Sequence, residues 1–223
     1  MEPNFEAQIF LDPDRIELHL KRQFDLSVGE LRSIAASIYR GFAQVSSLHP
    51  KGFNGTNAWA EGISQLRATL IPKGWRQDDP QGQPRIVSKN REISITVSSG
   101  NSDTGVPNRV PQTRNDKGSQ TATSVQFNAR QGVLFQMITA DTAPVVVQKL
   151  KDEALWIFLY YIDFDAGQMR FELSQPTNMS DADKINGWSI RYILPPLPLD
   201  PILDESKPED SPDIDFEVTP KVQ

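Results

Sequence analysis

Apolar and polar residues follow two different patterns within residues 154–174. The eight residues 155–162 are all apolar or aromatic, a run too short to span a membrane and typical of a strand that is covered on both faces. After a turn at 163–167, apolar residues alternate with polar ones, which predicts a second strand with one buried face and one face in water. The residues expected in water are Gln168, Arg170, Glu172 and Ser174. We therefore predict a β-hairpin within a sheet that has a substantial core.

Residues 12–24 fit two kinds of element. Asp12 followed by Pro13 is a good helix start, because Asp caps the first amides and Pro suits the first helical position. The same segment also alternates like a strand, with apolar side chains at Ile16, Leu18 and Leu20. The cap favours the helix, which is our prediction.

Two further helices are predicted before residue 75. Ser27 and Glu30 form a capping box, and the apolar residues within 31–45 recur with the spacing of an amphipathic helix. A second helix is expected over 58–71, with Asn57 as its cap. Together these two helices form a helical hairpin whose apolar stripes need a sheet, or each other, as partner.

From residue 75 onward the pattern favours strands. Residues 85–87 and 92–97 are predicted to pair as a hairpin. Residues 133–139 and 145–150 are predicted as two strands because they are rich in apolar and β-branched residues, and Trp188–Leu194 as the last one. Residues 98–123, which follow the predicted hairpin, contain almost no large apolar residue. Such a long loop is usually functional or disordered.

These elements predict an α+β fold. We expect an N-terminal helical hairpin layer packed on one mainly antiparallel sheet of about five to seven strands, with a disordered or extended acidic tail. A single domain would cover 1–198, with its helical part at 12–74 and its sheet part at 75–198, and the tail would cover 199–223. The alternative is a helical subdomain beside a separate β-domain.

Composition narrows the class of protein. The chain has 223 residues and no cysteine, which excludes disulfides, thiolate metal sites and cysteine nucleophiles and favours a cytoplasmic location. The N-terminus lacks the basic-then-apolar order of a secretory signal, and no apolar run reaches membrane-spanning length, so no membrane partner is expected. The formal net charge of -6 combines a mildly basic middle, 73–130, with a strongly acidic end, 199–223.

Three carboxylates near the central hairpin could hold a metal ion. Asp163 and Asp165 flank the predicted turn, and Glu172 lies on the predicted wet face of the returning strand. Hard oxygen donors of this kind suit magnesium or manganese. Turn chemistry alone also explains Asp at a hairpin turn, and that is the reading we prefer. We therefore expect no metal, no cofactor and no catalytic residue, and treat these three as weak candidates.

A set of basic residues in and before the long loop could contact phosphates or an acidic partner. These residues are Arg85, Lys89, Arg91, Arg109, Arg114 and Lys117. Gly100 and Gly105 have the spacing of a phosphate loop, but Val106 and Pro107 stand where such a loop needs Lys and Ser or Thr. A solvated surface loop is the simpler reading.

Other residue types carry less information. His19 and His49, the only histidines, are too few for a His-rich zinc site, and no serine-hydrolase motif is present. Most of the tryptophans are expected to anchor the core; they are Trp59, Trp75, Trp156 and Trp188.

The acidic tail contains one patterned segment. In residues 213–218, acids alternate with apolar residues, so an extended chain would place one set of side chains together, namely Ile214, Phe216 and Val218. Such a segment can add as a strand to an exposed sheet edge of a partner or of this protein. A solubilising tail is the simpler alternative.

These observations lead to one functional hypothesis and two alternatives. We expect a non-catalytic, cytoplasmic binding or regulatory protein that contacts a protein partner within a larger assembly through the loop 98–123, the acidic tail, or both. The first alternative is a metal-dependent phosphodiesterase or nuclease that uses the three carboxylates. The second is a nucleic-acid-binding protein without catalysis. The partner, the oligomeric state and the strand order do not follow from the sequence.

Overall fold

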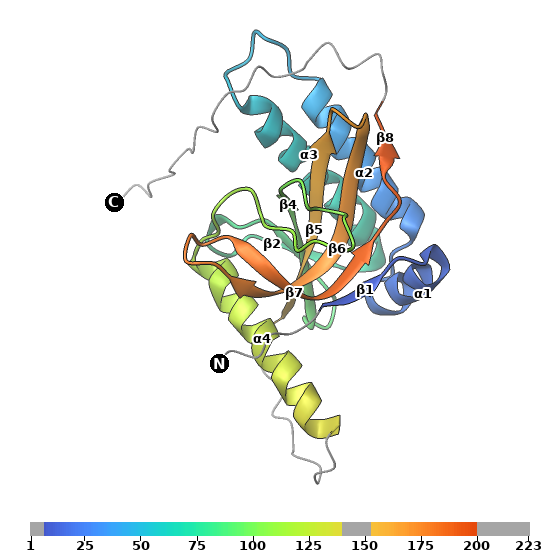
Figure 1. Cartoon of the computed structure of the whole chain (residues 1–223), viewed down its shortest axis with the longest axis vertical. Helices are drawn as coiled ribbons and strands as arrows, with labels where there is room; N and C mark the ends of the chain where they lie inside the picture. The colour runs from blue at the N-terminus through green and yellow to red at the C-terminus, as the bar shows by residue number, and fades with distance from the viewer. Residues whose placement is uncertain (1–6, 140–152, 200–223) are drawn as a thin grey trace.

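The computed structural model describes residues 7–139 and 153–199, with side chains described outside 131–139. Within these ranges the chain forms helices and strands in the order β1 (Gln8–Phe10), α1 (Pro13–Phe24), α2 (Val28–Ala43), α3 (Phe53–Leu70), η1 (Ile71–Lys73), β2 (Arg76–Asp78), η2 (Pro80–Gly82), β3 (Arg85–Val87), β4 (Ile93–Ser99), α4 (Ser119–Thr139), β5 (Ala154–Asp163), β6 (Gln168–Met179), β7 (Ile185–Ile193) and β8 (Leu197–Pro198). Figure 1 shows their arrangement.

The strands form one sheet in the order β1-β7-β6-β5-β4-β3-β2, and β8 pairs with β6 beyond the end of β7. In the described part of the chain, neighbouring strands pair antiparallel except for β4 with β5 and β1 with β7. Strands β4 and β5 can pair in parallel because the connection between them, which includes α4, returns the chain to the same end of the sheet. The predicted α+β fold with a mainly antiparallel sheet is confirmed, with a slightly larger sheet than expected.

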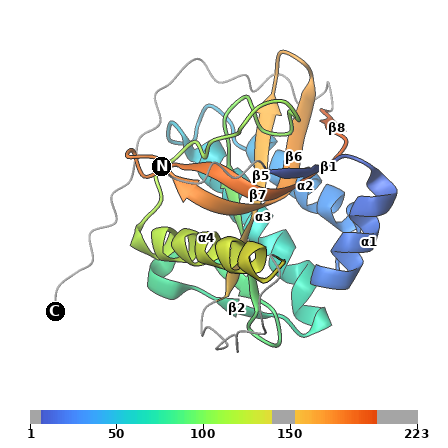
Figure 2. The same ribbon diagram turned by 60° about the horizontal axis from the view of Figure 1, so that its bottom comes forward.

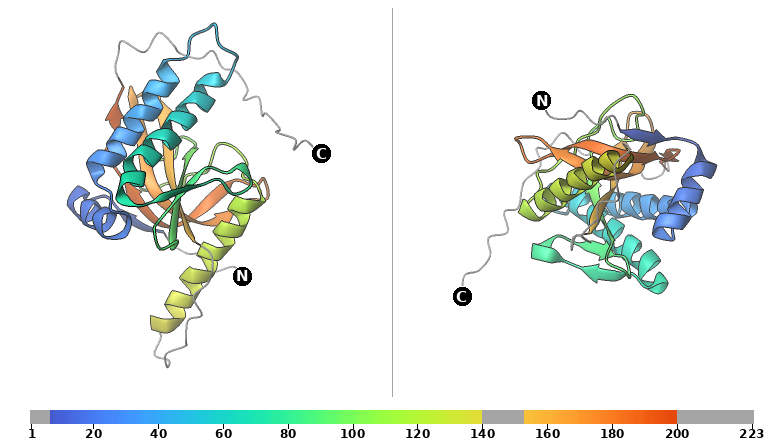
Figure 3. Two further views of the ribbon diagram at one scale, coloured as in Figure 1. Left: turned by 180° about the vertical axis from the view of Figure 1, so that it is seen from behind. Right: turned by 90° about the horizontal axis from the view of Figure 1, so that it is seen from below.

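Helices α1, α2 and α3 cover one face of the sheet (Figure 3, left). Their starts follow local chemistry: Asp12 caps α1, and Ser27 and Glu30 form the complete predicted capping box of α2. The apolar stripes of these helices meet the sheet in one large core, to which Phe24, Ile38, Leu66, Trp156, Phe158 and Phe171 contribute. The predicted helical layer on a sheet is therefore present.

Helix α3 starts earlier than predicted. It begins at Phe53, and its N-cap is Gly52, in the left-handed conformation with φ 79°, rather than Asn57. Gly adopts this left-handed conformation without strain, because it has no Cβ. It provides no side-chain hydrogen bond to the helix. The side chain of Asn57 instead donates to the carbonyl oxygen of Gly41 on α2 at 2.7 Å, which ties the two helices together.

The second face of the sheet is covered by α4 and by residues 100–118 (Figures 1 and 2). The strand predicted over 133–139 is wrong, because these residues end helix α4. Apolar residues occur all round this helix, so no stripe with a period of 3.6 marks it in the sequence. The strand predicted over 145–150 and the acidic tail from residue 200, with Ile214, Phe216 and Val218, lie outside the described residues.

The cover on the second face also corrects the prediction for β6. Glu172 and Ser174, expected in water, are fully buried. Alternation along a strand distinguishes its two faces but does not show that one of them is open to water. Strand β6 also continues past Ser174 to Met179, with irregular pairing to β7 around Pro176.

One side chain of α4 joins the helix to the sheet. Asn128 is 2% exposed; its amide nitrogen donates to the carbonyl oxygens of Leu155 and Pro176, both at 2.9 Å, and its oxygen accepts the Leu155 amide at 3.1 Å. The β5–β6 ladder runs as far as Ile157 opposite Ser174, so Leu155 and Pro176 would lie opposite each other two residues further along in the same register. Pro176 has no N–H to donate. The Asn128 side chain thus supplies hydrogen bonds that Leu155 and Pro176 cannot make with each other.

Within the described residues, no helix combines the length and the hydropathy that crossing a membrane requires.

Candidate binding groove

The three candidate carboxylates do not share a site. Asp163 pairs with Arg170 at 3.0 Å and accepts the Ala166 amide within the hairpin turn, Asp165 is exposed in that turn, and Glu172 is fully buried. Among residues 7–139 and 153–199, no three His, Asp or Glu side chains are grouped closely enough to hold a metal ion. This placement offers no support for the phosphodiesterase alternative.

Glu172 instead forms a buried ion pair with Arg191 of β7. The Nη2 and Nε atoms of Arg191 lie 2.6 Å and 3.2 Å from Oε2 of the carboxylate. Burial raises the pKa of Glu172, while the guanidinium of Arg191 and the backbone N–H of Gly105 favour its charged form. The guanidinium also donates to the carbonyl oxygens of Val106 and Arg109, at 3.3 Å and 2.7 Å. The pair is an anchor for the loop and is closed to ligands.

Further hydrogen bonds fasten residues 100–118 to the sheet. Thr113 donates its amide to the carbonyl oxygen of Ile185 and accepts the Ile185 amide with its hydroxyl, both at 3.0 Å. The indole nitrogen of Trp188 donates to Pro111 at 2.8 Å. The polar composition of this segment therefore reflects hydrogen bonding across the sheet, which the sequence alone did not reveal.

Two of the predicted basic residues stabilise the structure around β3. Arg85 is 4% exposed and donates to Gln83 and Ser124, joining β3 to α4. Burial lowers the pKa of its guanidinium. Arg91, in the turn after β3, pairs with Asp78 at 3.0 Å and with Glu153 at 2.7 Å.

The other four basic residues do not converge on one patch. Lys89 and Arg114 are exposed on separate turns, and Arg109 pairs with Asp103 at 3.1 Å. Lys117 is half-buried beside α4, and burial lowers the pKa of its ammonium group to about 8. Of the six predicted basic residues, Arg85 is buried and Arg91 and Arg109 are already paired with acids, which leaves fewer of them to contact a phosphate backbone.

Among the tryptophans, Trp75, Trp156 and Trp188 are buried core anchors, as predicted. Trp59 differs: it is only half-buried, although it packs against the large core. His19 is also half-buried, and its Nδ1 lies 3.2 Å from the hydroxyl oxygen of Tyr192.

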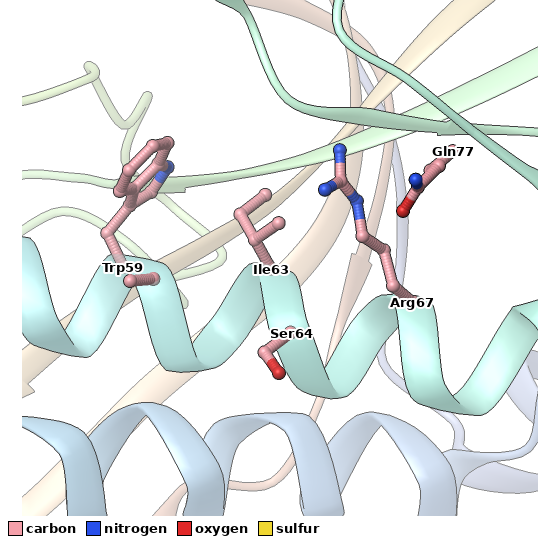
Figure 4. A pocket seen from close by; sticks show the side chains of 6 residues that line it. Trp59, Ile63, Ser64, Arg67 and Gln77 are labelled. Atoms are coloured by element: carbon pink, nitrogen blue, oxygen red, sulfur yellow. The ribbon is translucent and has the colours of Figure 1, made fainter.

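A groove runs between α3 and the edge strand β2. It has a volume of about 420 Å³ and is lined by Trp59, Ala60, Ile63, Ser64, Arg67 and Gln77. Figure 4 shows the side chains of Trp59, Ile63 and Arg67 rising from one side of α3 toward the strands, with Gln77 reaching toward Arg67 from β2. The spacing of four residues along α3 places an aromatic, an aliphatic and a cationic group in one row.

Arg67 forms the polar end of this row. Its Nη2 bonds to Asp79 and donates to the carbonyl oxygen of Arg85 at 3.3 Å. Its Nε is buried and has no hydrogen-bond partner in the described part of the chain. A buried donor without a partner costs free energy.

The wall of the groove opposite α3 is the last strand of the sheet. Strand β2 pairs with β3 on one side only, so its outer backbone groups face no other described strand. Arg76 and Gln77 on this strand are exposed. An open strand edge beside a groove is the arrangement that binds extended peptides by strand addition.

Comparisons with known proteins add no family to this description: no family model, no curated protein and no solved structure matches the chain.

Proposed function

We propose that this protein is a binding module that takes an extended acidic segment of a protein partner into the groove between α3 and β2. This keeps the class expected from the sequence, a non-catalytic binding or regulatory protein in the cytoplasm, and moves the contact surface from the loop to the groove. The observation that carries the proposal is the open edge of β2 beside the groove that Trp59, Ile63 and Arg67 line.

The groove supplies both parts of peptide recognition. The edge of β2 can donate and accept main-chain hydrogen bonds, which give affinity irrespective of sequence. Trp59 and Ile63 offer an apolar surface for every second side chain of an added strand, and a volume of about 420 Å³ lies within the range of ligand sites.

Charge favours an acidic partner over a basic one. Of the basic residues within 73–91, Arg76 is exposed on the edge strand itself, whereas Arg85 is buried and Arg91 is already paired with acids. A carboxylate near Arg76 gains a charge-assisted contact. Nucleic acid is a less suitable partner, because several of the basic residues are already paired with acidic side chains.

The test is binding of a fluorescein-labelled peptide in which Glu alternates with Val and Phe over six residues, followed by fluorescence anisotropy. The full chain carries Phe216→Ala, so that its own acidic–apolar segment does not compete. We expect saturable binding that Ser64→Glu weakens at least tenfold, because the added carboxylate fills the groove and repels the peptide.

The matched control is Ala68→Glu, an exposed residue of α3 that does not line the groove. It should leave the dissociation constant within about twofold. Absence of binding, or equal weakening by Ser64→Glu and Ala68→Glu, would contradict a peptide site in the groove.

A further inference from the structure

We propose that residues 213–218 of this chain occupy the α3–β2 groove and act as an intramolecular strap that a partner must displace. This inference rests on the function proposed above and names the regulation of the same site. The segment has the sequence Asp-Ile-Asp-Phe-Glu-Val, which alternates acidic and apolar residues in the pattern that the groove would select.

The register of β2 shows which face of an added strand would meet the groove. Gln77 lines the groove and pairs with Ile86, which belongs to the core on the helical face of the sheet. Successive side chains of a strand point to opposite faces. An added strand in the register that turns its apolar set toward Trp59 and Ile63 places its acidic set on the face that carries Arg76 and Asp78, where Asp78 is already paired with Arg91.

The two parts are also complementary in charge. Residues 199–223 carry eight acidic and two basic groups, and the β2 edge presents the exposed Arg76 on the face opposite Gln77. Acidic side chains beside Arg76 gain attraction that salt weakens, since exposed charges are screened beyond about 10 Å at 0.1 M ionic strength. The strap should therefore loosen as salt rises.

The chain between the sheet and the segment is long enough. Leu199 is tied to the sheet by its amide, which donates to Gly167 at 3.0 Å. Extended, the 14 residues from 200 to 213 span about 45 Å, whereas a domain of about 180 residues has a radius of gyration of about 16 Å. The segment can therefore reach either end of the sheet, including the β2 edge.

Tethering makes a weak contact effective. A short flexible tether holds its end at a local concentration on the order of 1 mM. If residues 213–218 bind the groove with a dissociation constant of about 0.1 mM, the strap raises the apparent dissociation constant of a competing peptide about tenfold.

The experiment compares binding of a labelled peptide with the sequence of residues 211–220 to three full-length chains. These are the unchanged chain, Phe216→Ala, and the control Leu203→Ala, which alters an apolar tail residue outside the segment. We expect Phe216→Ala to bind the peptide about tenfold more tightly than the other two chains, and the difference to shrink at 0.5 M salt.

Each other outcome has one meaning. If Phe216→Ala and the unchanged chain bind the peptide equally, the strap is refuted while the groove remains a peptide site. If neither chain binds, the proposed function fails and the strap with it. If the protection seen in the unchanged chain disappears on dilution and a dimer is seen by light scattering, the segment occupies the groove of a second copy, and the intramolecular strap is refuted.

Discussion

Replacing Asn128 with Leu should be among the most destabilising single changes in this chain. The side chain bridges α4, β5 and β6 through three hydrogen bonds of 2.9 to 3.1 Å, and it is 2% exposed. Leu has nearly the same size but no polar atom. The substitution therefore leaves the amide and carbonyl of Leu155 and the carbonyl of Pro176 without this partner, in a place that water does not reach.

The magnitude follows from the three lost contacts. A typical hydrogen bond contributes about 1 kcal/mol to folding, and a buried group left unsatisfied costs about 1–3 kcal/mol. Three contacts at the lower value predict a loss of about 3 kcal/mol in the free energy of unfolding. For a chain of this length, each kcal/mol lowers the melting temperature by about 2–4 °C, so a fall of about 6–12 °C is expected.

Urea denaturation followed by tryptophan fluorescence and far-UV circular dichroism measures this loss. The control is Asn178→Leu, since Asn178 is exposed and its side chain donates to the side-chain oxygen of Asn186 at 3.1 Å; its effect should stay within about 0.5 kcal/mol. Hydrogen exchange at the amide of Leu155 should accelerate in Asn128→Leu and not in the control.

A second variant separates hydrogen bonding from packing. Asn128→Asp keeps the size and one acceptor but directs oxygen atoms at two carbonyl oxygens, so it should also destabilise at pH 7. Its buried carboxyl would have a raised pKa, so stability should recover as pH falls and the group is protonated. If Asn128→Leu lowers the free energy of unfolding by less than about 0.5 kcal/mol, or if the stability of Asn128→Asp does not depend on pH, the Asn128 hydrogen bonds contribute no stability and our reasoning is wrong.

Three further changes test the second face of the sheet. Arg191→Met leaves Glu172 buried and unpaired, so urea denaturation should show a loss of about 3–5 kcal/mol; because the folded-state pKa of that carboxyl then rises further, stability should fall as pH rises from 5 to 7.5. Gly105 has φ 71°, and a Cβ there would lie 2.9 Å from the Cβ of Arg170, so Gly105→Ala should cost more than about 1 kcal/mol in the same assay and increase protease cleavage within 100–118. Burial lowers the pKa of Lys117 to about 8, so its charge destabilises the fold below that pH and not above 10.5. Lys117→Met should therefore be more stable than the unchanged chain at pH 7, and this difference in stability should disappear toward pH 10. A difference that stays constant with pH would argue against a lowered pKa.

Elements with a local signal were predictable from the sequence. The capping residues Asp12 and Ser27 marked the starts of α1 and α2, because a cap acts within three residues of its own position. The alternation after the run 155–162 marked the β5–β6 hairpin, because side chains on a strand alternate whatever surrounds it. These signals also implied the layer of helices on a sheet.

What covers each surface was decided by the tertiary structure. Helix α4 carries apolar residues all round, so no periodicity announced it. On the second face, α4 bonds the buried Arg85 through Ser124, and the loop 100–118 is bonded to the buried Glu172–Arg191 pair. Sequence reasoning had placed Arg85 in partner contact and Glu172 in water. The same is true of the groove. Trp59, Ile63 and Arg67 lie in one row on α3, a signal present in the sequence, yet only the pairing of β2 at the end of the sheet turns that row into one wall of a site. Residue spacing sets which side chains share a face, whereas burial depends on segments that are distant in the chain and meet only when it folds.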